Sequence, residues 1–478
     1  MSAPHASSTP GDALPDTRDL VGIGFGPANL ALAIAIREHN GRRASGEAIR
    51  ASFIERQDDF GWHQGMLLEG ATMQVSFLKD LVTMRDPGSP FSFLHYLQDR
   101  GRLADFINQK SFFPTRLEFH DYLRWCAASF TGQVDYATEA VEVRPAGPAD
   151  AADQLEVITR PASGAATRTG SGNGPQRAVR TRNLVLGTGL SPRVPDGVST
   201  GPHIWHNRDL LHRTTELTDR PHRRFVVVGA GQSAAESADH LHRTFPDAEV
   251  CAVFTRYGYS PADDSPFANR IFDPAAVDEF FRAPEQVKQQ LIGYHSNTNY
   301  AVVDGDLIEH LYRTVYQEKV AGTERLRILN TTALVAVEEL PDGARAVVRC
   351  LTTGETLTLD CDAVVLATGY RSTDPAELLG DLAEECLTDG QGRLRVGRDH
   401  RVETTDRVRA GIYVQGAAAE HTHGITASLL STLAVRSGEI CDSLLLRVAE
   451  REVRTTIAAM TTGATGTAAA ADGVPAHH

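Results

Sequence analysis

Apolar runs that end in glycine-rich turns occur twice along the chain. The first is LVGIGFGPANLALAIAI, which begins at Leu20, and the second is RRFVVVGAGQSAAESADHLHR, in which Phe225 to Val228 form a continuous apolar run. Such a run is typical of a strand buried in a parallel sheet, and the alanine-rich stretch after each turn is typical of a helix. Each segment therefore predicts a strand–turn–helix unit that starts its own βαβ domain.

Two other segments, NLVLGTGLSPRVP and AVVLATGYRSTDP, are near copies of each other. We interpret them as the places where the chain leaves a first domain and returns to it. The pattern predicts an α/β protein with two Rossmann-like dinucleotide-binding domains, a discontinuous one at about 18–195 plus 340–450 and an inserted one at about 205–335. The polar stretch between QLEVIT and NLVLGTG predicts a long hairpin tip.

Both ends of the chain are rich in small and polar residues, which predicts disordered tails at 1–17 and 455–478. The 47 Lys and Arg against 61 Asp and Glu give a net charge of −14, so neither nucleic acid nor a membrane is expected as a partner. No apolar run reaches the roughly 18–20 residues that span a bilayer, and no signal-peptide pattern is present. These features predict a cytoplasmic protein.

The six cysteines form no Cys-x-x-Cys pair, so we expect reduced, mostly buried thiols and neither a zinc ribbon nor a redox dithiol. His421 and His423 are spaced for a metal, but no cysteine and no acid beyond Glu420 accompanies them. We therefore expect no metal site there.

The two glycine turns differ in ways that predict different nucleotides. In such a turn the first glycine permits the bend, and the second lets the backbone approach a pyrophosphate at the helix N-terminus. The positions concerned are Gly24, Gly26 and Pro27 in the first turn, and Gly229, Gly231, Gln232 and Ser233 in the second. The alternative is that both are ordinary tight turns that hold no nucleotide.

The two strands that follow the glycine turns end in residues of opposite charge, an acid after the first turn and an arginine after the second. Glu55 after the first turn suits the ribose hydroxyls of FAD, unless it is only a surface charge. Arg256 after the second turn suits the 2′-phosphate of NADPH, although its neighbour Thr255 is an alternative for this position. FAD and NADPH together predict a flavoprotein, and without a cysteine pair the remaining common electron acceptor is O₂.

Several stretches together resemble the N-hydroxylating flavin monooxygenases, and among them the ornithine Nδ-hydroxylases of siderophore biosynthesis. In chain order, they are GFGPANLALA, FGWHQGMLLEGATMQVSFLKDLVTMRDPGSPFSFLHYL, FFPTRLEFHDYLRW, VVVGAGQSAAE, DDSPFANRIFDP, NTNYAVVD, VVLATGY and EHTHGITASLLSTLA. The resemblance also explains Asn29, which stands where the third glycine of the first turn is usual. In this family that position is an asparagine, and we expect Asn29 to contact FAD or to order the turn.

The resemblance implies that NADPH reduces FAD, O₂ adds to give a hydroperoxyflavin, and the distal oxygen passes to the neutral side-chain amine of L-ornithine. It implies retention of NADP⁺ during catalysis, assembly into a homotetramer or dimer, and a small, mostly helical substrate-binding region at about 260–312. The flavin supplies the oxygen chemistry, so the protein mainly positions the reactants and excludes water.

Carried over position by position, the resemblance gives each site residue an expected role. Lys79 is the cation for the substrate carboxylate. Asn269 and Asn299 are polar contacts to the α-groups and the side chain of the substrate. Gln74, Ser431 and Leu429 lie near the junction of flavin and substrate, and Trp62 and His63 border the isoalloxazine ring. The residues show no obvious base for the substrate amine.

Two alternatives remain open from the sequence. One is an L-lysine or diamine N-hydroxylase of the same family, because one methylene is worth only about 1–3 kcal/mol of discrimination. The other is an uncoupled NADPH oxidase or a non-catalytic flavin-binding protein.

Overall fold

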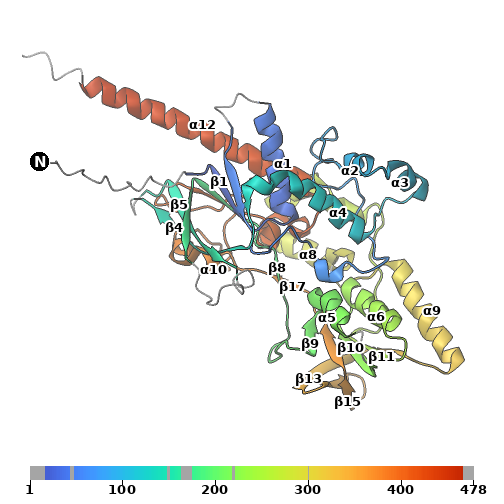
Figure 1. Cartoon of the computed structure of the whole chain (residues 1–478). Helices are drawn as coiled ribbons and strands as arrows, with labels where there is room; N and C mark the ends of the chain where they lie inside the picture. The colour runs from blue at the N-terminus through green and yellow to red at the C-terminus, as the bar shows by residue number, and fades with distance from the viewer. Residues whose placement is uncertain are drawn as a thin grey trace, which may run out of the picture.

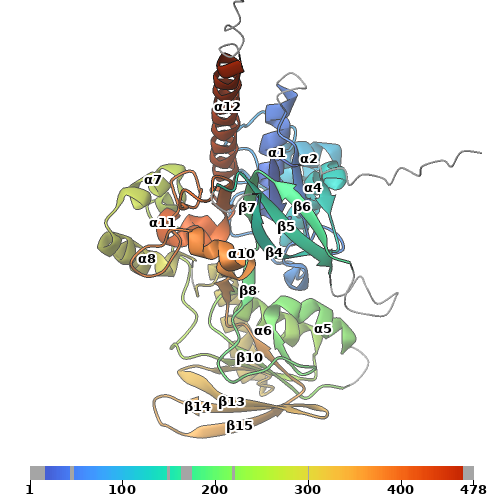
Figure 2. The same cartoon turned by 90° about the vertical axis from the view of Figure 1, so that its left-hand side faces the viewer.

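The computed structural model describes residues 17–42, 48–147, 151–162, 175–217, 221–299 and 301–466. The chain forms two lobes, each built around a parallel sheet, and the long helix α12 (Leu433–Gly466) projects from the first lobe, away from the second (Figures 1 and 2). The predicted tail at 1–17 lies almost entirely outside the described residues. Within them, no helix has the length and apolarity that crossing a membrane requires.

The first lobe contains a five-stranded parallel sheet. Its order is β18 (Gly411–Val414), β7 (Asn183–Leu186), β1 (Leu20–Ile23), β2 (Ala51–Ile54) and β3 (Val134–Asp135). All residues of β1, β7 and β18 are buried, as expected for strands covered on both faces. Helix α1 (Pro27–Gly41) connects β1 to β2 and packs against α12.

Three helices and an aromatic core complete one side of this lobe. They are α2 (Phe93–Asp99), α3 (Leu103–Gln109) and α4 (Arg116–Ala127), followed by the 3₁₀ helix η3 (Ala128–Gln133). The side chains of Ser92 and Thr115 accept hydrogen bonds from the first turns of α2 and α4, which fixes where these helices begin.

An antiparallel sheet covers the other side of the first lobe. It consists of β4 (Thr138–Ala146), β5 (Gln154–Pro161) and β6 (Arg177–Thr181). The pairing of β5 with β6 confirms the predicted hairpin, while the tip at 163–174 lies outside the described residues.

The second lobe also has a five-stranded parallel sheet. Its order is β12 (Leu326–Leu329), β11 (Glu249–Val253), β10 (Arg224–Val228), β16 (Ala363–Leu366) and β9 (Ile204–His206). Helices α5 (Leu210–Glu216), α6 (Gln232–Thr244) and α9 (Gly305–Ala321) belong to this lobe. The two sheets and their turns confirm the predicted fold class.

The domain boundary predicted near residue 340 is wrong. Strands β13 (Thr332–Leu340), β14 (Gly343–Cys350) and β15 (Thr356–Cys361) form an antiparallel sheet whose apolar face packs on the second lobe, and β16 is a strand of the second parallel sheet. The chain returns to the first lobe only after β16. There β17 (Tyr370–Ser372) pairs with β8 (Leu190–Pro192), so the outgoing and returning segments run side by side as a two-stranded ribbon.

The remaining elements lie mostly between the lobes or along the first one. The helices are α7 (Pro274–Arg282), α8 (Glu285–Asn299), α10 (Ala376–Leu379) and α11 (Glu420–His423). The 3₁₀ helices are η2 (Gln64–Met66), η5 (Asn207–Asp209), η6 (Ala268–Phe272), η7 (Gly380–Glu385), η8 (Gly416–Ala419) and η9 (Ile425–Ser428). Helices α7 and α8 lie beside α11 (Figure 2), so the predicted substrate-binding region contacts the first lobe as well as the second.

The prediction of a disordered tail at 455–478 is wrong for residues 455–466. They continue α12 as helix, whereas residues 467–478 lie outside the described part of the chain. The stretch has few large apolar side chains, but its alanines and the turns before it favour helix propagation. The six cysteines are free thiols, and all except the half-buried Cys350 are buried, as predicted.

Candidate active site

The first glycine turn has the geometry that a dinucleotide pyrophosphate requires. Gly24 has φ +82°, and a Cβ there would lie 2.4 Å from the carbonyl oxygen of Gly187, so a larger residue would be strained and would clash. Gly26 is the N-cap of α1, Pro27 follows at the start of the helix, and a Cβ on Gly26 would meet nothing within 4 Å. The helix N-terminus is thus open to an anion, which fits the pyrophosphate of FAD.

Asn29 orders this turn from inside the protein. Its Nδ2 donates to the carbonyl oxygens of Gly24 at 2.6 Å and Ile23 at 3.2 Å, and its Oδ1 accepts from Nε2 of Gln415 at 2.9 Å. The residue is 1% exposed and packs against Gly187, where a Cβ would lie 2.7 Å from its amide nitrogen. Of the two expected roles, these contacts favour the ordering of the turn.

We expect Asn29→Ala to lower the free energy of unfolding by about 2–3 kcal/mol, because buried carbonyls and the Gln415 amide lose their partner. FAD affinity should fall as well, since the Gly24 carbonyl belongs to the turn. Denaturant unfolding and flavin titration measure the two effects. Asn40→Ala is the control, because its amide makes two bonds to Ile49 at the far end of α1. Unchanged stability and FAD affinity in Asn29→Ala would contradict this role.

Glu55 lies at the end of β2 next to the same turn. Its Oε2 accepts a hydrogen bond from the backbone N–H of Phe25 at 2.7 Å, and its Oε1 accepts one from Gln57 at 2.9 Å. The carboxylate is buried, so it is not the simple surface charge of the alternative interpretation. It is held where the turn and the strand end meet, and its contact with a ribose stays a prediction.

The second turn repeats this geometry in the second lobe. Gly229 has φ +146°, and a Cβ there would lie 2.2 Å from the carbonyl oxygen of Ala367. Gly231 is the N-cap of α6, and Ser233 lies in the first turn of that helix. A helix N-terminus behind a glycine turn fits a second pyrophosphate, as NADPH requires, and the backbone of Ala301 lies against Gly231 there.

The loop after α8 contacts this second turn. Gln232 accepts a hydrogen bond from the backbone N–H of Asp304 at 2.8 Å, and Arg256 donates from Nη1 to the carbonyl oxygen of Ala301 at 2.7 Å. The end of the predicted substrate-binding region is therefore tied to the predicted NADPH turn. The interaction of Arg256 with a 2′-phosphate stays a prediction.

Trp62 and His63 lie between the two lobes, where the flavin ring is expected. His63 adopts the left-handed conformation with φ 49°, and its ring lies 4.9 Å from that of Trp62 and 6.2 Å from that of Tyr370 in the returning ribbon. Crowding by protein, and secondly the charge of Arg116, lower the pKa of His63 although part of the residue stays exposed. The imidazole is thus favoured in its neutral form.

The structure brings part of the predicted substrate set together. The Lys79 ammonium lies 5.7 Å from the ring centroid of Phe272, in the segment FANRIFDP. Burial lowers the Lys79 pKa, and the neighbouring charge of Asp273 acts in the opposite direction. Asn269 lies in the same segment, where its Nδ2 donates to the carbonyl oxygen of Asp264 at 2.7 Å.

The other predicted substrate and flavin contacts are less closely grouped. Gln74 is exposed in the loop before Lys79, and Asn299 ends α8 with its side chain outside the described part of the structure. Leu429 follows η9 directly, and Ser431 is buried two residues later. The assigned roles of these four residues stay predictions.

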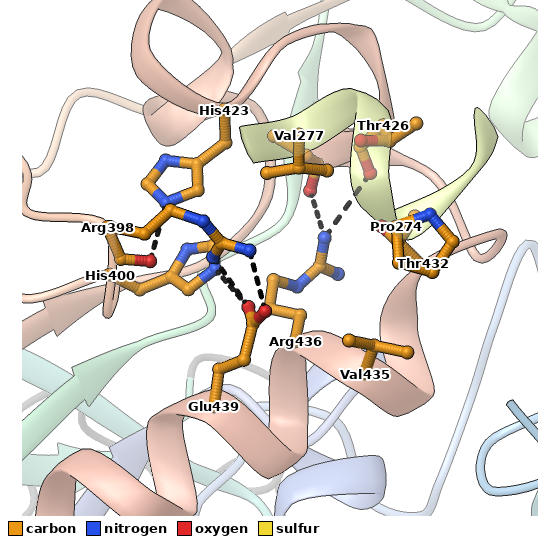
Figure 3. A pocket seen from close by; sticks show the side chains of 11 residues that line it. Pro274, Val277, Arg398, His400, His423, Thr426, Thr432, Val435, Arg436 and Glu439 are labelled. Atoms are coloured by element: carbon orange, nitrogen blue, oxygen red, sulfur yellow. Dashed lines mark hydrogen bonds and ion pairs between the residues drawn. The ribbon is translucent and has the colours of Figure 1, made fainter. Parts of the chain in front are cut away.

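A polar cluster lies next to η9, and we call it the η9 support cluster (Figure 3). Its members are Arg398, His400, His423, Arg436 and Glu439. Arg436 is buried and donates from Nη1 to the carbonyl oxygens of Ala427 at 2.7 Å and Thr426 at 3.3 Å (Figure 3). It thereby fixes the 3₁₀ turn that leads to Leu429 and Ser431.

The other four residues of the η9 support cluster form an ion pair and a stacked pair of imidazole rings. Glu439 accepts two hydrogen bonds from Arg398, at 2.7 and 2.8 Å, and lies 3.6 Å from Nε2 of His400. The rings of His400 and His423 stack with centroids 3.9 Å apart. Burial first, and then the neighbouring His400, lower the pKa of His423 to about 2.

This cluster predicts an acid sensitivity of stability. Because the folded protein keeps His423 neutral, stability is present above the unfolded pKa of about 6.5 and is lost as the pH falls below it. Between pH 7 and 5 the loss from His423 is about 2 kcal/mol, whereas Glu439, with a pKa lowered to about 2, contributes its loss only below about pH 4.5. Wild type should therefore lose more stability than His423→Gln over this range in denaturant unfolding. Equal losses would show that His423 is not the sensitive group.

The two histidines of EHTHG have separate partners. His421 Nε2 lies 2.8 Å from the carbonyl oxygen of Leu394, and His423 Nε2 lies 3.2 Å from that of Arg398. Among the residues that the structure places, no three His, Cys, Asp or Glu side chains gather as a metal site.

Like Arg436, three further residues near the site have no signal in the sequence. Gln415 holds Asn29, and Arg116 forms an ion pair with Glu236 across the lobes. The partners are 386 and 120 residues apart in the chain, and no local pattern marks them.

Each of the two lobes has a glycine turn at the N-terminus of a helix, and an acid lies beside the first turn. This arrangement defines a flavoprotein oxidoreductase with two dinucleotide sites. The family model described as L-lysine 6-monooxygenase/L-ornithine 5-monooxygenase matches residues 16–372. The chain belongs to this family, which confirms the resemblance seen in the sequence.

Individual relatives agree with this membership. The L-ornithine N(5)-monooxygenase of Burkholderia cepacia is 40% identical over 413 residues, which cover 85% of this chain and 89% of the relative. The solved ornithine N-hydroxylase of Kutzneria sp. 744, whose description includes reduced FAD, NADP⁺ and L-ornithine, is 46% identical with a TM-score of 0.83, covering 90% of this chain and 99% of that one. The L-lysine 6-monooxygenase of Pseudomonas syringae is 32% identical with a TM-score of 0.77, covering 90% and 100%.

Proposed function

We propose that this protein is an FAD- and NADPH-dependent L-ornithine N⁵-monooxygenase. The observation that carries the proposal is the likeness to the Kutzneria ornithine N-hydroxylase over nearly the whole of both chains, together with the two glycine turns that fit its cofactors. The overall reaction consumes NADPH, H⁺ and O₂ and converts the side-chain amine to a hydroxylamine, with NADP⁺ and water as the other products. The product is suited to hydroxamate formation, as in siderophore biosynthesis.

The chain's own residues hold the reactants. The first turn, with Asn29 and Glu55 behind it, would hold FAD, and the second turn with Arg256 would hold NADPH. The bound flavin supplies the activation of oxygen. Retained NADP⁺ would help to keep water away from the reacting centre.

Lys79 is positioned to attract the α-carboxylate of an amino acid. Its partly buried ammonium lies beside the ring of Phe272 and near Asp273, and a charge-assisted hydrogen bond at a partly buried site is stronger than in water. Asn269, Asn299 and Gln74 are neutral groups that can contact the rest of the substrate without favouring the protonated, unreactive amine. The proposal also includes a cytoplasmic location and a homo-oligomer, either dimer or tetramer.

The test compares amine substrates on the FAD-loaded protein. With NADPH and O₂ present, we expect hydroxylated L-ornithine to form with a kcat/KM at least 10-fold above that for L-lysine or cadaverine, measured by mass spectrometry of the products. Equal turnover of the amines, or faster turnover of lysine, would show that the protein is instead an L-lysine or diamine N-hydroxylase of the same family. NADPH consumption that yields only peroxide would instead support the uncoupled oxidase.

A further inference from the structure

Arg116 and Glu236 form an ion pair between the two lobes. Arg116 is the first residue of α4 in the first lobe, and Glu236 lies on α6 in the second. Nη1 and Nη2 of the arginine donate to the two carboxylate oxygens at 3.0 and 2.8 Å, which is the bidentate geometry of the strongest ion pairs. The side chains are only 14% and 7% exposed, so salt screens the pair poorly.

Each partner is also bonded to an element of a predicted cofactor site. Arg116 donates from Nη1 to the carbonyl oxygen of Met66 at 3.1 Å, in the short helix that follows His63. Glu236 accepts from Nε2 of Gln232 at 2.9 Å. The other end of the Gln232 amide accepts from the backbone of Asp304 at 2.8 Å, at the start of α9. The connection therefore runs from the flavin border to the helix N-terminus of the NADPH turn.

The neighbouring contacts between the lobes explain why the pair is placed here. The backbone of Gly65 approaches that of Arg208 so closely that a Cβ on Gly65 would lie 1.8 Å from the Arg208 carbonyl oxygen. Met66 and Leu68 from the first lobe are buried in the apolar core of the second. Apolar contacts allow sliding, whereas a bidentate ion pair fixes both distance and orientation.

The covalent connection between the two lobes constrains their relative orientation less than these contacts do. The chain crosses between the two parallel sheets at the β8–β17 ribbon, which is only two short strands wide. A ribbon of this kind can twist, so the relative orientation of the lobes depends on contacts outside it. Hydride transfer needs the donor and acceptor atoms about 3–3.5 Å apart, and a displacement of 1 Å can cost about 100-fold in rate.

We propose that the Arg116–Glu236 pair is a positioning pair that holds the lobe of the NADPH turn in the orientation relative to the first lobe that hydride transfer to FAD would require, and that orients Gln232 for the bound nucleotide. This inference rests on the proposed use of FAD and NADPH, and it assigns the two residues no contact with the reacting atoms. Breaking the pair leaves a buried charge without its partner, so both lobes should shift or loosen at this contact.

The test uses Arg116→Ala, Glu236→Ala and the double variant of the full-length, FAD-loaded protein. We expect NADPH to reduce the flavin about 10- to 100-fold more slowly in stopped-flow absorbance, with weaker NADP⁺ binding, whereas dithionite still reduces the flavin fully. The double variant should be no slower than the worse single variant, because the pair acts as a unit. Arg116→Lys and Glu236→Gln should give intermediate rates, and they keep the test valid if an alanine variant fails to fold.

The control is Arg85→Ala, which breaks a similarly buried ion pair, Arg85 to Glu38 at 2.7 Å, within the first lobe. It should lower stability but leave the reduction rate unchanged. Hydrogen exchange of residues 229–236 and 64–68 gives a readout that does not depend on turnover, and exchange should rise in the Arg116 variant but not in the control. Wild-type reduction rates in Arg116→Ala, or an equal slowing in Arg85→Ala, would overturn the inference. Failure of the wild-type protein to bind FAD would instead refute the proposed function, while the exchange experiment would still test the pair.

Discussion

Replacing Lys79 by alanine should raise the KM for L-ornithine about 10- to 100-fold and leave the reduction of FAD by NADPH largely unchanged. Loss of a hydrogen bond to a charged group costs about 1.5–3 kcal/mol, which corresponds to this range. The selectivity follows from position, because Lys79 lies beside Phe272 and Asp273, in the predicted substrate-binding region. Steady-state kinetics with ornithine and stopped-flow reduction without it measure the two properties separately.

Lys288→Ala is the matched control for this prediction. Its ammonium also lies 5.7 Å from aromatic rings, those of Phe280 and Phe281, and burial likewise lowers its pKa. If both variants raise KM equally, the effect reflects the loss of a partly buried lysine in general. If Lys79→Ala abolishes flavin reduction as well as substrate binding, the assigned role is wrong.

Gly229→Ala should reduce NADPH-dependent flavin reduction by at least about 100-fold while the protein keeps its FAD. The added Cβ would lie 2.2 Å from the Ala367 backbone at a φ that alanine rarely adopts, so the second turn must move. The first turn lies on a different sheet and should keep its geometry. Flavin content, NADP⁺ titration and the reduction rate measure the outcome.

Gly258→Ala is the control for the second prediction. Gly258 lies in the loop two residues after Arg256, its φ is not positive, and a Cβ there would meet nothing within 4 Å. It should behave as wild type. NADP⁺ binding and flavin reduction that survive in Gly229→Ala would show that this turn does not hold the nucleotide.

The two dinucleotide folds could be predicted because their signals are local. An apolar strand, a glycine turn and a helix lie within about 20 residues, and the steric demands at Gly24 and Gly229 follow from the bend itself. The exit and return of the chain were also visible, in the paired copies that became β7–β8 and β16–β17. The predicted return point is too early because the strands β13 to β15 alternate like those of any antiparallel sheet. Only their packing on β10 and β11 assigns them to the second lobe.

The site could be predicted only in part, for a physical reason. The resemblance supplied residues such as Lys79 and Ser431, but not what holds them in place. Arg436 fixes the η9 backbone through main-chain carbonyls, and Arg116 bonds to a helix of the other lobe. Such contacts depend on three-dimensional placement, which a local sequence pattern does not encode. Asn29 shows the same limit, because its hydrogen-bond partner Gln415 is 386 residues away in the chain.

The proposed N-hydroxylation is tested most directly by the amount of N⁵-hydroxy-L-ornithine formed for each NADPH consumed by the FAD-loaded protein in air-saturated buffer. With ornithine present we expect a ratio close to one, as for an enzyme that retains NADP⁺ and excludes water. Full consumption of NADPH with hydrogen peroxide as the product and no hydroxylated ornithine would contradict it.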